Sequence, residues 1–380
     1  MSVKFKIIYA LFILILTIFT VELGSAYYLN SVLEKATEKK FKFDSYRVYG
    51  HQPGFREGDN EGDWIIFNSQ GFRRDEEVSL VKPEGTFRAF LMGGSTAAGV
   101  SAPPPYPIAH VYMDETIDAH LERMLEKAFP NKHIEIINVA AAGYQVFQHT
   151  SYLLSELLNY DPDLVIFLDG ANDHYRFNPQ IDYYLDFKYQ FWSPRLKEPN
   201  LGGLWDYFAH YMADYSAFFR GYFAWKLQHD ARIRDADPRF KFEAESDQEI
   251  IGGYRIASEK GYLRSTQVNI DILKREGIDV ILSLQPALNL RNKNLLSDVE
   301  SSFYRGRGDV SDLLYPLIKE DLEKLAFQNA VGFVDLVPIF NDQRYAKKQL
   351  FIDYVHVNDS GGKIIAEALF NLASPLVEKP

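Results

Sequence analysis

Three polar residues have the types and spacing needed for nucleophilic catalysis. Ser95 follows two glycines and the short apolar run at 87–92, and Asp353 precedes His356 by three residues near the end of the chain. A serine hydroxyl is a weak nucleophile until a base takes its proton. The short Asp-to-His spacing lets one loop present both side chains, so that the carboxylate orients the imidazole and stabilises its charged form. This set of residues predicts acyl transfer through a covalent serine ester.

Acyl transfer also needs hydrogen-bond donors aimed at the developing oxyanion. The candidates are the backbone N–H groups of Ser95 and Gly143 and the side-chain amide of Asn172. Each of the three residues follows a short apolar run typical of a buried strand. Because ligands of parallel sheets bind beyond the carboxyl ends of the strands, we expect these donors to gather at one edge. Gly93 and Gly94 permit a tight turn and leave space beside the serine.

The elements that must position these residues alternate along the chain. Apolar runs predict five strands, at 87–92, 133–140, 164–168, 280–284 and 331–336. Helical spacing predicts helices at 115–129, 145–158, 258–276 and 311–329, followed by a last helix that Asp359 caps and that ends at Leu372. Repeated strand-then-helix order predicts a parallel sheet with helices on both faces.

Composition excludes several classes of protein. The chain has 380 residues, of which 47% are hydrophobic and 24% charged, enough for a sizeable core. Its net charge of -11 argues against a nucleic-acid partner, since phosphate binding needs a basic surface. The absence of cysteine rules out disulfides, thiolate zinc sites and a lipoprotein anchor.

The N-terminal region, residues 1–29, is a membrane anchor or a signal peptide. Two lysines precede an apolar run over 7–21, and small residues follow at Gly24 and Ala26. A signal peptide would be cleaved at these small residues. An uncleaved anchor would continue through 27–29, with tyrosines at the interface. We favour the anchor, because apolar character resumes after Glu22, and expect the bulk of the chain outside the cytoplasmic membrane; cleavage would instead give a secreted protein.

Two other regions flank or interrupt the predicted sheet. Residues 30–85 are expected to connect it to the anchor, with a loop at 49–62 and a surface turn at 68–73. An insertion at 180–250 is crowded with aromatic residues, several of them at helical spacing between 204 and 222. Such a stripe is typical of core packing, and a substrate-lining or membrane-contacting lid is the alternative.

Four motifs, in order, resemble the SGNH (GDSL-type) hydrolase family in its membrane-anchored bacterial form. They are Gly-Gly-Ser-Thr at 93–96, with glycine where aspartate is usual, Asn138 through Gly143, Gly-Ala-Asn-Asp at 170–173, and Asp-Tyr-Val-His at 353–356. The resemblance covers about residues 86–375 and implies a three-layer, flavodoxin-like α/β fold. It implies Ser95 as nucleophile, His356 as base and then acid, and Asp353 as its orienting partner. Ser95, Gly143 and Asn172 would form the oxyanion hole, with no cofactor or metal.

Several functions remain open at this point. The leading hypothesis is an esterase or deacylase acting on an acylated envelope glycan or a related ester, including a lipid ester. An O-acyltransferase would use the same triad, and a non-catalytic, membrane-anchored envelope-assembly protein would use none of it. A metal-dependent phosphoesterase would draw its ligands from five residues, Asp169, Asp173, His174, Asp353 and His356. Gln285, at the end of a predicted strand, is a candidate substrate contact; the sequence leaves the oligomeric state open.

Overall fold

The chain divides into two compact units in a computed structural model. The first comprises Met1–Phe43 and Gln180–Glu243, and the second comprises Asp44–Pro179 and Ala244–Pro380. The structure describes residues 3–28, 41–58, 60, 62–99, 111–174, 212, 216–219, 222, 246–304 and 309–379. All candidate catalytic residues belong to the second unit.

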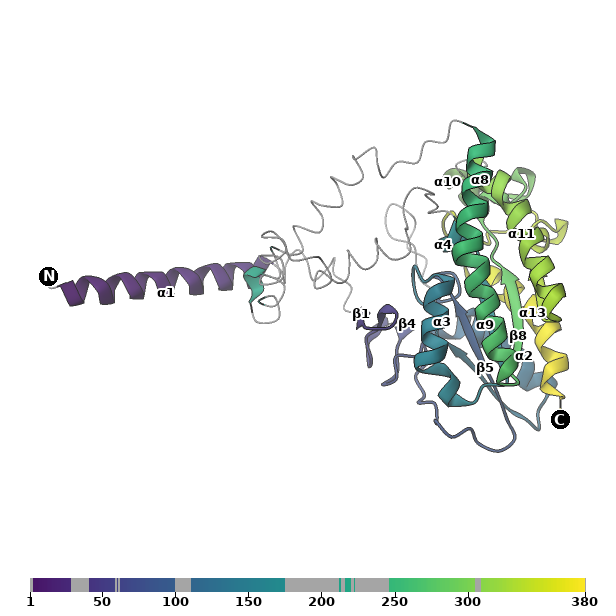
Figure 1. Cartoon of the computed structure of the whole chain (residues 1–380), viewed down its shortest axis with the longest axis horizontal. Coiled ribbons are helices and arrows are strands. Elements are labelled where there is room, and N and C mark those ends of the chain that lie inside the picture. Colours follow the sequence, from purple (N-terminus) through teal and green to yellow (C-terminus); the bar gives the residue numbers. More distant parts are fainter. Residues whose placement is uncertain are drawn as a thin grey trace. The chain divides into compact units, whose positions relative to one another are not determined.

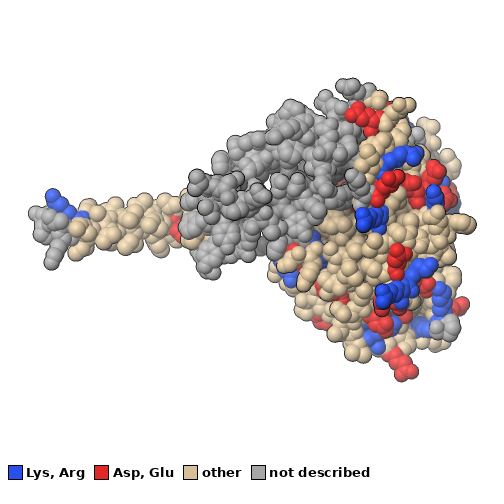
Figure 2. Space-filling model, in the orientation of Figure 1, with Lys and Arg blue, Asp and Glu red and all other residues tan. Residues whose placement is uncertain are grey.

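The first unit is dominated by one apolar helix, α1 (Val3–Tyr28). Its stretch Phe5–Tyr27 is 23 residues long with a mean hydropathy of 2.4, long and apolar enough to cross a membrane. Charged residues appear only towards its two ends in Figure 2. Glu22 accepts a hydrogen bond from Ser216 Oγ (2.7 Å) and others from the backbone N–H groups of Ala217 and Phe218. The predicted aromatic helical face at 204–222 otherwise lies largely outside the described residues.

The second unit is built on a five-stranded parallel sheet (Figure 1). Its strands are β5 (Thr86–Gly93), β6 (His133–Asn138), β7 (Leu164–Asp169), β8 (Asp279–Leu284) and β9 (Gly332–Asp335). The strand order is β6-β5-β7-β8-β9, which is the flavodoxin-like order with β5 as the first strand. All five predicted strands and the three-layer α/β fold are therefore confirmed. The direction of winding changes between β5 and β7, which is the point at which sheets of this kind bind their ligands beyond the carboxyl ends of the strands.

Helices cover both faces of the sheet. On one face α2 (Ile117–Ala128) packs against α13 (Asp359–Val377). On the other face α3 (Val146–Ser155) packs beside α9 (Leu263–Arg275), and α11 (Asp309–Asn329) packs against α9, β8 and β9 (Figure 1). Alternate residues of the strands, among them Ala89, Leu91, Ile134, Ile136, Ile166 and Leu168, join Leu121, Leu125, Ile365 and Leu369 in one buried cluster. The apolar residues that recur at helical spacing in the sequence are thus the ones that the helices bury against the sheet.

Shorter elements complete the second unit. The remaining α-helices are α4 (Ala171–His174), α8 (Asp247–Ala257), α10 (Asp298–Phe303) and α12 (Val337–Phe340). Short 3₁₀ turns lie at Met113–Glu115, Leu157–Tyr160, Leu288–Leu290, Lys293–Leu295 and Gln343–Tyr345, and a π-helical turn at Ser258–Tyr262 joins α8 to α9.

Helix boundaries differ from the predictions in several places. The last helix, expected to end at Leu372, continues to Val377, because Ala373 and Val377 extend its buried face. The helix expected from 258 begins at Asp247, because Ser246 caps it by accepting the N–H of Glu249. The cap of the last helix is Asn358, whose side chain accepts the N–H of Gly361 at 3.0 Å, so the prediction of Asp359 was wrong. Asp359 instead accepts from His120 Nε2 at 2.8 Å.

The segment before β5 is more structured than a connecting loop. Strand β1 (Phe41–Asp44) comes first, then β2 (Val48–His51), and β3 (Arg56–Gly58) pairs antiparallel with β4 (Asp63–Ile66). The prediction of a plain loop at 49–62 was therefore wrong.

The predicted surface turn at 68–73 is also wrong, because its flanks are buried. Phe72 is fully buried and packs edge-on to Phe90 and Tyr160, with centroids 6.0 and 5.2 Å away. The Asn68 side chain accepts the N–H groups of Gln70 and Phe72, both at 3.0 Å. Phe72, at the end of the turn, thus packs the turn against the core, and the side chain of the buried Asn68 accepts two of the turn's backbone N–H groups.

Candidate active site

The structure brings Ser95, His356 and Asp353 into one hydrogen-bonded row. Ser95 Oγ lies 2.7 Å from His356 Nε2, and His356 Nδ1 lies 2.6 Å from Asp353 Oδ2. Ser95 begins the turn after β5, whereas the other two residues share the loop between β9 and α13. With the imidazole proton on Nδ1, the ring donates to Asp353 and accepts from the serine hydroxyl. This is the arrangement a general base needs to receive the Ser95 proton.

The loop that contains Asp353 and His356 is held by hydrogen bonds to the Asp353 carboxylate. Asp353 Oδ1 accepts the backbone N–H groups of Val355 (2.8 Å) and His356 (2.6 Å), which leaves Oδ2 for the imidazole. Burial raises the pKa of Asp353, but the hydrogen bonds and charge of His356, helped by the two N–H groups, outweigh it and hold that pKa below its usual value. Since the side chain is 1% exposed, a buried anion faces the imidazole throughout the neutral range.

The two glycines before Ser95 are required by close approach of neighbouring groups. A Cβ on Gly93 would overlap the Leu168 carbonyl oxygen of β7, and a Cβ on Gly94 would overlap the Asn172 side-chain nitrogen. Neither glycine has a positive φ. The sequence predicts a tight turn at these glycines. The structure adds a second reason for them, because without side chains they let the turn that carries Ser95 lie directly against β7 and the residues that follow it.

Thr96 and Gln285 fix the serine turn to the histidine loop. Thr96 Oγ1 donates to the Val355 carbonyl at 3.2 Å and accepts from Gln285 Nε2 at 2.8 Å. Gln285 is 7% exposed, and this bond makes it a support of the turn after β5; its contact with substrate stays a prediction.

Gly143 lies in the turn after β6, and Asn172 lies in α4, the short helix that follows β7. Gly143 has a φ of +75°, a conformation that favours glycine. Asn172 Nδ2 donates to the Tyr144 carbonyl at 2.9 Å. An amide nitrogen carries two hydrogens, so one more remains for a ligand, beside Gly94 and one residue from the nucleophile. Gln145 Nε2 holds the Asn172 carbonyl at 3.1 Å and so fixes the turn.

The acidic residues in and next to the third motif make contacts within the protein. Asp169 bonds His149 Nε2 at 3.0 Å, with both side chains buried, and Asp173 accepts the backbone N–H of Val146 at 3.2 Å. The side chain of His174 lies outside the described residues. Among the residues that the structure describes, no three His, Asp or Glu side chains are grouped as metal ligands.

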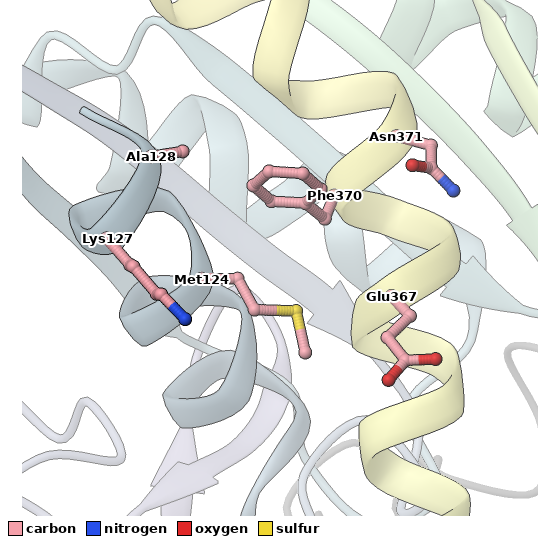
Figure 3. Close-up of a pocket in the computed structure, with 6 residues that line it drawn as sticks. All are labelled: Met124, Lys127, Ala128, Glu367, Phe370 and Asn371. Carbon is pink, nitrogen blue, oxygen red and sulfur yellow. The ribbon is translucent and has the colours of Figure 1, made fainter.

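A surface groove between α2 and α13 is separate from this site. Six residues line it: Met124, Lys127, Ala128, Glu367, Phe370 and Asn371 (Figure 3). Figure 3 shows Met124 of α2 and Phe370 of α13 projecting into the space between the two helices, with Lys127 on α2 and Glu367 on α13. It contains no residue of the Ser95 site.

Sequence reasoning missed residues that support the site from a distance. Tyr49 Oη donates to the Ala142 carbonyl at 2.6 Å, beside Gly143, although 93 residues separate the two. Arg291 and Glu300 form a fully buried ion pair next to the backbone that leads into Asp353. A tyrosine in a loop-like stretch and an Arg–Glu pair nine residues apart carry no signal that distinguishes them from surface residues.

Comparison with known proteins finds similarity only among solved structures. No family model matches the chain, and no curated protein does. Three of the similar structures are an acetyl xylan esterase, AlAXEase (15% identity, TM-score 0.40, 75% of this chain and 98% of that one), LAE5, an α/β hydrolase enzyme from the metagenome of Lake Arreo, Spain (14%, 0.43, 76% and 96%), and a putative GDSL-like lipase from Parabacteroides merdae (14%, 0.40, 76% and 96%). At these values the functional argument rests on this chain's own residues.

Proposed function

We propose that this protein is a membrane-anchored serine ester hydrolase of the SGNH type. The observation that carries the proposal is the row from Ser95 Oγ through His356 to Asp353, with distances of 2.7 and 2.6 Å. The four motifs that resemble the SGNH family all meet at the same edge of the sheet, beyond β5, β6 and β7. The chemistry follows from these side chains alone.

The reaction proceeds through an acyl-enzyme. His356 Nε2 takes the proton of Ser95 Oγ as the oxygen attacks the ester carbonyl, and Asp353 stabilises the resulting imidazolium. The N–H groups of Ser95 and Gly143 and the second Asn172 amide hydrogen receive the oxyanion. The intermediate collapses as His356 returns the proton to the leaving alcohol. His356 then takes a proton from water as the water attacks the acyl group, and it returns that proton to Ser95 Oγ as the acid is released.

We infer an ester outside the cytoplasmic membrane as the substrate, because we expect the catalytic unit to lie there. α1 provides a candidate span, and the chain after it carries the catalytic unit. The face in Figure 2 shows acidic and basic residues interspersed over the second unit, with no basic patch of the kind that nucleic-acid binding requires. An acylated envelope glycan fits this location, with water as the acyl acceptor.

The test of the proposal is turnover of p-nitrophenyl acetate by the full chain beside Ser95→Ala. We expect the variant to lose at least about 10⁴-fold in kcat, because the covalent step has no other nucleophile. A fluorophosphonate probe should label the wild-type protein at Ser95 and leave Ser95→Ala unlabelled. Turnover that persists in Ser95→Ala, with labelling at another residue, would refute the assignment.

Gly94→Ala should impair the same reaction while leaving the triad in place. The added Cβ overlaps the Asn172 amide nitrogen, so the amide must move away from Tyr144 and from the oxyanion position. We expect kcat to fall by about 10² to 10³, the usual effect of losing one oxyanion donor. Gly252→Ala is the control, because a Cβ there meets nothing within 4 Å. Equal activity of the two variants would argue against Asn172 as a donor.

A further inference from the structure

The loop that carries Gly143 is held by a tyrosine from the N-terminal part of the second unit. Tyr49, in β2, is 4% exposed, and its hydroxyl donates to the Ala142 carbonyl at 2.6 Å. The Tyr144 hydroxyl donates in turn to the Tyr49 carbonyl, also at 2.6 Å. The two rings meet edge to face with centroids 5.2 Å apart. Two reciprocal hydrogen bonds, one partly buried and one buried, therefore join β2 to the loop on either side of Gly143.

The bond to Ala142 constrains the oxyanion donor through the peptide plane. The Ala142 carbonyl and the Gly143 N–H belong to one planar trans peptide, in which they point in opposite directions. Fixing the carbonyl therefore fixes the direction of the N–H. Gly143 has a φ of +75° and no side chain to resist rotation of that plane. A Cβ at Gly143 would lie 3.1 Å from the Tyr49 hydroxyl, so glycine also leaves room for this contact.

Arg47, two residues before Tyr49, holds this part of the chain on α3, the helix that follows the Gly143 loop. The Arg47 carbonyl accepts from Gln148 Nε2 at 2.7 Å. The Arg47 guanidinium lies 3.7 Å from the centroid of the Tyr152 ring and bonds Asp44 at 2.6 Å. Since α3 begins at Val146, directly after the loop, the same rigid element positions both Tyr49 and Gly143.

We propose that Tyr49 is a positioning residue for the oxyanion hole, acting by orienting the Ala142–Gly143 peptide. The inference rests on the proposed function and makes the segment between the membrane helix and the sheet part of the catalytic apparatus. Tyr49 touches no reacting atom. Its hydroxyl keeps the Gly143 N–H aimed at the site, so the loss of the hydroxyl should weaken transition-state binding and leave ground-state binding unchanged.

The experiment compares Tyr49→Phe with the wild-type full chain in detergent micelles. We expect kcat for p-nitrophenyl acetate to fall about 10- to 100-fold, less than or equal to the loss of a whole oxyanion donor, with KM within about twofold. The inhibition constant of an alkyl trifluoromethyl ketone, which forms a tetrahedral adduct on Ser95, should rise by the same factor as kcat/KM falls. A residue important only for folding would lower the active fraction without moving this inhibition constant.

The matched control is Tyr254→Phe. Tyr254 is equally buried, and its hydroxyl bonds Asp321 at 2.9 Å between α8 and α11, neither of which carries a residue of the proposed triad or oxyanion hole. Tyr254→Phe should keep wild-type kcat and inhibition. Ser95-dependent turnover that Tyr49→Phe leaves unchanged would overturn this inference alone. Absence of any Ser95-dependent turnover in the wild-type protein would overturn the proposed function and this inference with it.

Discussion

Asp353→Asn should lower kcat by about 10⁴-fold while leaving the site folded. The backbone N–H groups of Val355 and His356 both point at Oδ1, so the asparagine must place its carbonyl oxygen there. Its NH₂ group then faces His356 Nδ1, which can no longer donate and must accept. The imidazole proton moves to Nε2, the atom that has to receive the Ser95 proton. The variant therefore fails because its histidine is in the wrong tautomer.

Asp359→Asn is the matched control for this prediction. It changes a second Asp–His pair, in which Asp359 Oδ1 lies 2.8 Å from His120 Nε2. That pair joins α2 to α13, and the Asp359 side chain is 47% exposed, so kcat should stay within about twofold of the wild-type value, as for most surface substitutions. Initial rates with p-nitrophenyl acetate and the circular dichroism of both variants provide the measurement. More than a tenth of wild-type activity in Asp353→Asn would contradict the assigned role of the carboxylate.

The sheet and the triad could be predicted because both depend on local patterns. Each strand is a short apolar run, and the alternation with helices determines that the sheet is parallel and where the strand ends gather. Ser95 and Asn172 each follow a strand directly, while Asp353 and His356 lie within one short loop. Their convergence at one edge therefore follows from topology.

The supporting contacts could not be predicted, because they join residues whose sequence separation has no pattern. Tyr49 reaches Ala142 across 93 residues, and Thr96 meets Gln285 across 189. The prediction of a surface turn at 68–73 is wrong for the same reason. The polar composition of the turn is typical of a surface, but Phe72 packs against Phe90 of β5 in the core. The sequence could not decide between Asn358 and Asp359 as the helix cap, because the two residues are adjacent and both residue types favour the N-cap position.

Arg291→Met should cost about 3 to 5 kcal/mol of unfolding free energy, because it leaves a buried carboxylate without its partner. Arg291 and Glu300 are both fully buried, with Arg291 NH1 within 2.7 Å of each carboxylate oxygen. Burial lowers the pKa of Arg291, and the charge of Glu300 opposes that shift. Arg291 also donates to the carbonyls of Tyr345 (2.6 Å) and Lys348 (3.0 Å). The substitution thus frees backbone that leads to Asp353.

The unfolding free energy of Arg291→Met, measured by denaturant titration, is best judged against Arg344→Met. Arg344 pairs with Asp342 at the surface, where its side chain is 72% exposed, so that loss should be below about 1 kcal/mol. Adding Glu300→Gln to Arg291→Met should recover part of the loss, since a neutral amide at position 300 removes the unpaired charge and can still accept the Leu350 and Phe351 N–H groups. If Arg291→Met costs no more than Arg344→Met, the pair does not hold the loop. If the double variant is less stable than Arg291→Met, the unpaired charge of Glu300 is not the main cause of the loss, and the bonds that its second oxygen accepts from Ser297, which an amide nitrogen cannot accept, outweigh it.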